Sequence, residues 1–131
     1  MGDLAYWPAA KPLSKKNTFA KNRDFIKNLD HIDQIWEKLK FKCGDTLAVC
    51  DLRGKYKEKF SYSELADLIT KVSFSFENYG LKKGDVVTVI SENSPRWLAV
   101  DQGLMRLGAI NAVRGINSPS VELDYIIGHS N

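Results

Sequence analysis

Apolar residues recur at helical spacing from Asp30 onward, at positions i, i+3, i+4 and i+7. They are Ile32, Ile35, Trp36 and Leu39. This spacing predicts a helix with one apolar face, which Gly44 is expected to end. Such a stripe is typical of a helix that packs against a core.

A β-hairpin is predicted next. Residues 46–52 are rich in β-formers, residues 53–55 read Arg-Gly-Lys and supply a turn, and residues 56–60 alternate aromatic side chains with lysine and glutamate. The alternation indicates one strand with a solvated face. Its charges protect an exposed sheet edge.

A second helix is predicted from Ser61, because Ser61-x-x-Glu64 is a capping box. Gly80 stands where a left-handed residue would end this helix, and Leu81 is then expected to fold back on Phe76. The apolar face of the helix is Leu65, Leu68, Ile69, Val72, Phe76 and Tyr79.

The pattern strand, helix, strand, helix follows the polar turn at residues 82–85. The apolar run 86–90 predicts a strand covered on both faces, and 109–113 predicts a second. Ser94 caps the helix between them, Pro95 takes its first position and Gly108 ends it. Its apolar residues surround much of its circumference: Trp97, Leu98, Val100, Leu104, Met105 and Leu107.

A further capped helix is predicted after Arg114-Gly115. Ser118 is expected to cap it, Pro119 to take its first position, and the helix to end at about Gly128. Leu123, Ile126 and Ile127 line it. Two strands joined by a buried helix should be parallel, so we expect an α/β fold with a partial parallel sheet, covering helices and a β-hairpin. Two strands are too few for a stable parallel sheet, so we expect an incomplete domain.

The junction Ser91–Trp97 joins a strand to a helix, the place where α/β proteins commonly hold phosphate. A phosphate cradle needs successive glycines or a glycine-rich loop with a lysine, and neither is present. Glu92 would repel an anion there. We therefore predict a structural junction, with Arg96 in a surface or interdomain contact. Arg114, at the end of a predicted parallel strand, could face a ligand crevice but is expected to form a salt bridge.

Composition is that of an ordinary globular domain: 131 residues, 44% hydrophobic and 27% charged, with a net charge of +3. No apolar run is long enough to span a bilayer, and residues 1–6 lack an apolar signal core, which predicts a cytoplasmic protein. Residues 1–60 carry 13 basic and 8 acidic side chains. Residues 1–27 are therefore read as a basic leader, whose lysines are solvated or, alternatively, meet an acidic membrane or a polyanion.

No catalytic, cofactor-binding or metal-binding residue is predicted. Cys43 and Cys50 are too few for a disulfide framework and too far apart for a Cys-x-x-Cys site. His31 and His129 have no partners at metal spacing. No Ser/His/Asp set, carboxylate pair or Cys/His pair can be assembled from the spacing.

Several ordered motifs in residues 61–131 resemble the start of the adenylate-forming (AMP-binding) ligases, which include acyl-CoA synthetases, luciferase and peptide-synthetase adenylation domains. The motifs are Phe60–Leu65, Gly80–Val87, Ser91–Trp97, Gly108-Ala109 and Glu122–Ile127. Within the family, Asp101-Gln102-Gly103 and Asn111–Gly115 are most similar to the long-chain acyl-CoA and acyl-acyl-carrier-protein synthetases of cyanobacteria and plastids.

The resemblance implies that residues 28–131 are an N-terminal fragment of a long-chain fatty acid ligase. The parent activity uses ATP and Mg²⁺ to form an acyl-adenylate, from which CoA or acyl-carrier protein takes the acyl group. The family's phosphate loop, nucleotide contacts, Mg²⁺-binding glutamate and adenylation lysine find no counterpart here, so the isolated chain is expected to be inactive. A split gene would require a complementary C-terminal polypeptide. The alternative is a non-catalytic module that docks through the exposed sheet edge at residues 109–113.

Overall fold

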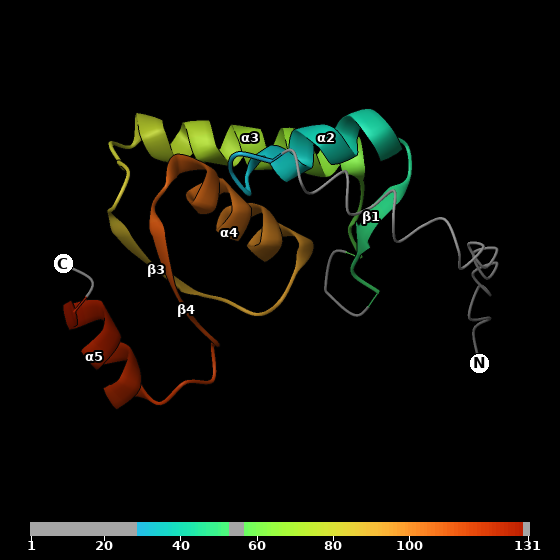
Figure 1. Ribbon diagram of the computed structural model, residues 1–131. Coiled ribbons are helices and arrows are strands. Elements are labelled where there is room, and N and C mark those ends of the chain that lie inside the picture. Colours follow the sequence, from blue (N-terminus) through green and yellow to red (C-terminus); the bar gives the residue numbers. More distant parts are fainter. Residues whose placement is uncertain (1–28, 53–56, 130–131) are drawn as a thin grey trace, which may run out of the picture. The chain divides into compact units, whose positions relative to one another are not determined.

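The computed structural model describes residues 29–52 and 57–129 (Figure 1). The predicted basic leader, with its lysines, and the predicted turn at residues 53–55 lie outside the described residues. The chain divides into two units, Met1–Ile32 and Asp33–Asn131, and the helices and strands described below belong to the second. Its elements are α2 (Gln34–Cys43), β1 (Leu47–Cys50), β2 (Lys59–Ser61), α3 (Tyr62–Asn78), β3 (Val86–Ile90), α4 (Pro95–Leu107), β4 (Ile110–Arg114) and α5 (Ser120–His129).

Both predicted sheets form. Strands β1 and β2 pair antiparallel, and β3 and β4 pair parallel from Val86 opposite Ile110 to Ile90 opposite Arg114. Each sheet has two strands among the described residues. The expectation of an α/β fold with a partial parallel sheet, covering helices and a hairpin is confirmed.

Helix α3 has the predicted capping box and the predicted C-terminal end. Ser61 Oγ accepts from the N–H of Glu64 at 3.2 Å, and a Glu64 carboxylate oxygen accepts from the N–H of Ser61 at 2.8 Å. At the other end Gly80 has φ +93°, and the N–H of Leu81 donates to the carbonyl of Phe76 at 3.1 Å. This is the Schellman pattern.

Several predicted boundaries and faces are wrong. Residues 86–90 form β3, but Val86 and Ile90 are 38% and 40% exposed, so this strand is not covered on both faces. The first helix begins at Gln34, not near Asp30, because residues 32 and 33 form a turn before it, and Ile32 is 63% exposed. Tyr79 is 86% exposed because α3 ends at Asn78 and Tyr79 is its C-cap. In α4, Met105 is 38% exposed, although the sequence predicted it to be part of the helix's largely buried apolar surface.

The core lies where α3 packs against α4, α2 and the hairpin. Its buried centre is Leu65 and Ile69 of α3 with Ala99 of α4, and α2 contributes Trp36. Gly103 of α4 is buried against α3: a Cβ there would lie 2.8 Å from Val72 Cγ1. In the part of the chain that is described, no helix is long and apolar enough to cross a membrane.

Candidate functional site

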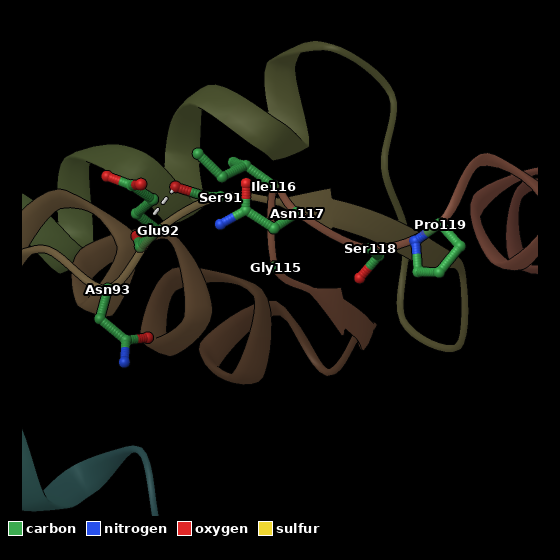
Figure 2. Close-up of a pocket in the computed structure, with 8 residues that line it drawn as sticks. All are labelled: Ser91, Glu92, Asn93, Gly115, Ile116, Asn117, Ser118 and Pro119. Atoms are coloured by element: carbon green, nitrogen blue, oxygen red, sulfur yellow. Dashed lines mark hydrogen bonds between the residues drawn. The ribbon is translucent and has the colours of Figure 1, made fainter.

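An open pocket of about 540 Å³ lies where β3 and β4 end (Figure 2). Two loops line it, residues 91–93 after β3 and residues 115–119 after β4. The N–H of Ser91 donates to the carbonyl of Arg114 at 3.1 Å and joins the two strand ends. This is the crevice at the carboxyl ends of parallel strands where α/β proteins bind ligands.

The pocket lining is poorly suited to a nucleotide. Glu92 is its one charged residue, and the others are serine, asparagine, glycine, isoleucine and proline. A carboxylate repels phosphate, and a triphosphate needs cations or several inward-facing N–H groups. The described residues of this pocket therefore do not fit ATP with its Mg²⁺.

The start of α4 is built for capping, as the sequence predicted. Ser94 Oγ accepts from the N–H of Trp97 at 3.0 Å, and its carbonyl accepts from Leu98 at 3.0 Å. Pro95 occupies the first helical position and has no N–H. The amide of Trp97 that would face an anion is thus already bonded, which supports the structural interpretation of Ser91–Trp97.

Both arginines that the sequence singled out form surface ion pairs. The Arg96 guanidinium lies 2.6 Å from Oε1 of Glu58, the residue before β2, and the Arg96 side chain is 70% exposed. Arg114 Nε lies 2.7 Å from Glu122 Oε1 in the first turn of α5. Neither arginine lines the pocket.

The second predicted cap is displaced by one residue. The N–H groups of Glu122 and Leu123 both donate to the carbonyl of Pro119, so Pro119 stands at the cap position and α5 begins at Ser120. Ser118 instead donates its N–H to the carbonyl of Gly115, closing a turn at 3.2 Å. The turn moves Ser118 out of the helix start. Of the residues predicted to line α5, Leu123 and Ile126 are half-buried and Ile127 is exposed.

A polar network that the sequence did not predict joins α2, α4 and β4. Trp36 Nε1 donates to Gln102 Oε1 at 2.8 Å, and Gln102 Nε2 donates to Asp101 Oδ2 at 2.9 Å. The other oxygen of Asp101 accepts from Asn111 Nδ2 at 2.9 Å. Asp101, Gln102 and Asn111 come from the motifs Asp101–Gly103 and Asn111–Gly115, and Trp36 comes from α2. The sequence does not show that these residues pair, because Trp36 is far from the others along the chain.

The cysteines and histidines form no chemical site in the described residues. Cys43 and Cys50 are free thiols, and no group of three His, Cys, Asp or Glu side chains there could hold a metal ion. His129 stacks on Tyr125 with ring centroids 4.0 Å apart.

Lys40 and Asp67 form an ion pair at the surface, and the hydrogen bond to Asp67 raises the pKa of Lys40. Neither residue is close in sequence to the residues that line the pocket.

Comparisons with known proteins agree with the fold. The chain is 35% identical over 99 residues to a probable acyl-activating enzyme 16 of Arabidopsis thaliana and 34% identical to its long-chain-fatty-acid–[acyl-carrier-protein] ligase AEE15, both chloroplastic. Those matches cover 76% of this chain and 14% of either relative. The N-terminal subdomain of NpsA from Klebsiella oxytoca superposes with a TM-score of 0.67 at 25% identity, over 78% of this chain and 26% of that one.

The family model described as AMP-binding enzyme matches residues 36–131. That range includes every strand described above and both loops of the pocket. The chain belongs to the family of AMP-binding enzymes.

Proposed function

We propose that residues 28–131 form the opening part of the large domain of a long-chain fatty acid ligase, preceded by a basic leader at residues 1–27. The ligase joins a fatty acid to ATP as an acyl-adenylate and passes the acyl group to CoA or acyl-carrier protein. The observation that carries this proposal is the family match over residues 36–131, together with 34% identity to a relative named as a fatty-acid–acyl-carrier-protein ligase.

In this proposal the isolated chain is catalytically inactive, and ATP, Mg²⁺ and the acyl acceptor are bound by polypeptide outside it. The chain spans 14% of the two Arabidopsis relatives. Its pocket carries a carboxylate and no cation, whereas stabilising a leaving pyrophosphate requires positive charge. The role left to this chain is to build part of the sheet and to position its loops.

The proposal also places the ligase in the cytoplasm, in peripheral contact with the membranes into which long-chain fatty acids partition. Cell fractionation tests this point: we expect the protein in the cytosolic fraction, with a membrane-bound share that high salt releases. An integral membrane fraction that resists salt would contradict it.

Fatty-acid-dependent exchange between ATP and pyrophosphate tests the activity. The purified 131-residue chain is expected to show none, with the full Arabidopsis ligase as positive control. A chimaera in which residues 33–131 replace the matching segment of that ligase is expected to exchange pyrophosphate. Exchange by the isolated chain would overturn its predicted inactivity, whereas a folded but inactive chimaera would count against the ligase assignment.

The DNA downstream of Asn131 offers an inexpensive second test. Translation in all frames is expected to show a glycine-rich phosphate loop with its lysine. Such a loop in the same frame indicates a longer ligase, and one in another frame indicates a broken or split gene with a complementary C-terminal polypeptide.

A non-catalytic interaction module is the second candidate function. It is favoured by exposed aliphatic side chains on the two-stranded sheet: Val86 is 38%, Ile90 40% and Ile110 55% exposed. Each strand of a two-stranded sheet is an edge that can pair with another chain. A folded, stable monomer without any phosphate loop downstream would support the module, as judged by size exclusion and circular dichroism.

A further inference from the structure

The first wall of the pocket, residues 91–93, is attached to the backbone of Arg114 (Figure 2). The parallel pairing of β3 and β4 ends at Ile90 opposite Arg114. Directly after it, the N–H of Ser91 donates to the carbonyl of Arg114 at 3.1 Å. This bond uses backbone atoms alone, so it does not depend on the Arg114 side chain.

The second wall, residues 115–119, has bonds that shape it locally. The N–H of Ser118 donates to the carbonyl of Gly115 at 3.2 Å and closes a turn. The carbonyl of Pro119 accepts from the N–H of Glu122 at 3.0 Å, which joins the loop to α5. Each of these bonds links residues three positions apart, so neither ties the far end of the wall back to β4.

The Arg114 side chain makes that longer connection. Its Nε donates to Glu122 Oε1 at 2.7 Å, and Glu122 lies in the first turn of α5. A second guanidinium nitrogen donates to the carbonyl of Val113 at 2.6 Å, which keeps the side chain at the strand end. The Arg114–Glu122 pair therefore closes a ring of chain that contains the whole second wall.

Apolar packing gives the second wall little support. A Cβ added at Gly115 would have nothing within 4 Å, and Ile116 is 51% exposed. Helix α5, into which the wall leads, has no buried residue. A segment with few apolar contacts opens easily, so its order depends on its polar contacts. The Arg114–Glu122 pair matters here for this reason, although its side chains are 41% and 46% exposed.

We propose that the Arg114 side chain is an ionic clasp that holds the second wall of the pocket in place. Arg114 then fixes both walls, the first through its carbonyl and the second through its guanidinium. A ligand in this pocket meets an ordered second wall only while the clasp is closed. This inference goes beyond the ligase proposal and stands if that proposal fails.

Amide hydrogen exchange of the 131-residue chain, measured by NMR, tests the clasp. In Arg114→Gln the Ser118 amide is expected to exchange roughly two- to fivefold faster, the range that corresponds to an exposed ion pair. The Ser91 amide should be unchanged, because its bond is to the backbone. The matched control Arg96→Gln removes another exposed ion pair, with Glu58, and should alter neither amide. Equal acceleration at Ser118 in both variants, or none in Arg114→Gln, would overturn the proposal.

A double-variant cycle shows whether the two side chains act together. Glu122→Gln is expected to accelerate Ser118 exchange as much as Arg114→Gln does, and the double variant no further, because both changes remove the same bond. Effects that multiply in the double variant would contradict the clasp. Circular dichroism of the three variants verifies that the helices persist.

Salt separates an ionic clasp from steric support by the arginine side chain. At about 1 M NaCl charges are screened beyond about 3 Å. The wild-type Ser118 amide is therefore expected to exchange faster in high salt and to approach the rate of Arg114→Gln, whose own rate stays constant. A difference between the two proteins that is the same at low and high salt would refute the ionic clasp.

Discussion

Adding one methyl group at Gly103 should destabilise the contact between α3 and α4. An ideal Cβ at this position lies 2.8 Å from Val72 Cγ1 and 3.2 Å from the backbone nitrogen of Ser73. The optimum between carbon atoms is about 3.5–4.0 Å. Val72 can move only by changing a stiff χ1 angle, and the nitrogen of Ser73 is held in α3.

The size of the effect follows from two opposing terms. Overpacking a core site costs about 1–3 kcal/mol, and replacing glycine by alanine inside a helix returns about 1 kcal/mol. Gly103→Ala should therefore lower the free energy of unfolding by about 1 kcal/mol. With a urea slope of about 1 kcal/mol/M for a small domain, the midpoint should fall by about 1 M.

Urea unfolding followed by circular dichroism measures the shift. Gly128→Ala is the matched control, because Gly128 is also helical but has nothing within 4 Å of an added Cβ. It should be neutral or slightly stabilising. Adding Val72→Ala to Gly103→Ala should cost less than Val72→Ala alone, because it relieves the close contact. A Gly103→Ala protein as stable as the Gly128→Ala control would refute the reasoning.

Three further predictions concern local interactions. Ser61→Ala removes the capping box of α3 and should cost about 1 kcal/mol in urea unfolding, whereas Ser75→Ala on the exposed side of α3 should be nearly neutral. Asn111→Ala removes a donor to the half-buried Asp101 carboxylate and should cost about 2 kcal/mol, against almost nothing for Asn117→Ala in the pocket loop. Lys40 has a pKa raised by its hydrogen bond to Asp67, so this pair stabilises the fold below the ordinary lysine pKa and loses its effect as pH rises through the raised value. The difference between wild type and Lys40→Met should therefore stay constant up to about pH 10 and shrink as the pH rises further, and a difference that stays constant there as well would contradict the assignment.

Helix caps and helix ends that depend on residues within about one helical turn of each other were predictable from the sequence. The box at Ser61 and Glu64, the left-handed Gly80 and Gly108, and the cap at Ser94 each depend on residues at most four positions apart. The prediction that Ser118 caps α5 used the same local rules and was wrong. The N–H of Ser118 donates to the carbonyl of Gly115 and closes a turn there instead. Local rules therefore predict where a helix starts, except where a turn and a helix cap compete for the same residue.

Contacts between distant segments were not predictable. Trp36 and Gln102 are 66 positions apart, and Arg96 and Glu58 are 38 apart. Nothing in either neighbourhood marks the partner. The sequence did indicate that the arginines lie at the surface, because no phosphate-binding pattern surrounds them, but only the folded chain identifies the acid that each one meets.

The alternation of side chains along β4 links the polar network of Asp101 and Asn111 to the pocket. Asn111 points to Asp101 and thereby fixes which side chains face α4. Ala112 and Arg114 must then point to the opposite face of the sheet, where Arg114 bonds Glu122. One residue further, Gly115 begins the loop that lines the pocket. A slip of one residue would exchange the two faces and remove both the Asp101 and the Glu122 contacts. The motif Asn111–Gly115, through which the chain resembles the fatty acid ligases, thus acts here by setting strand register and loop position.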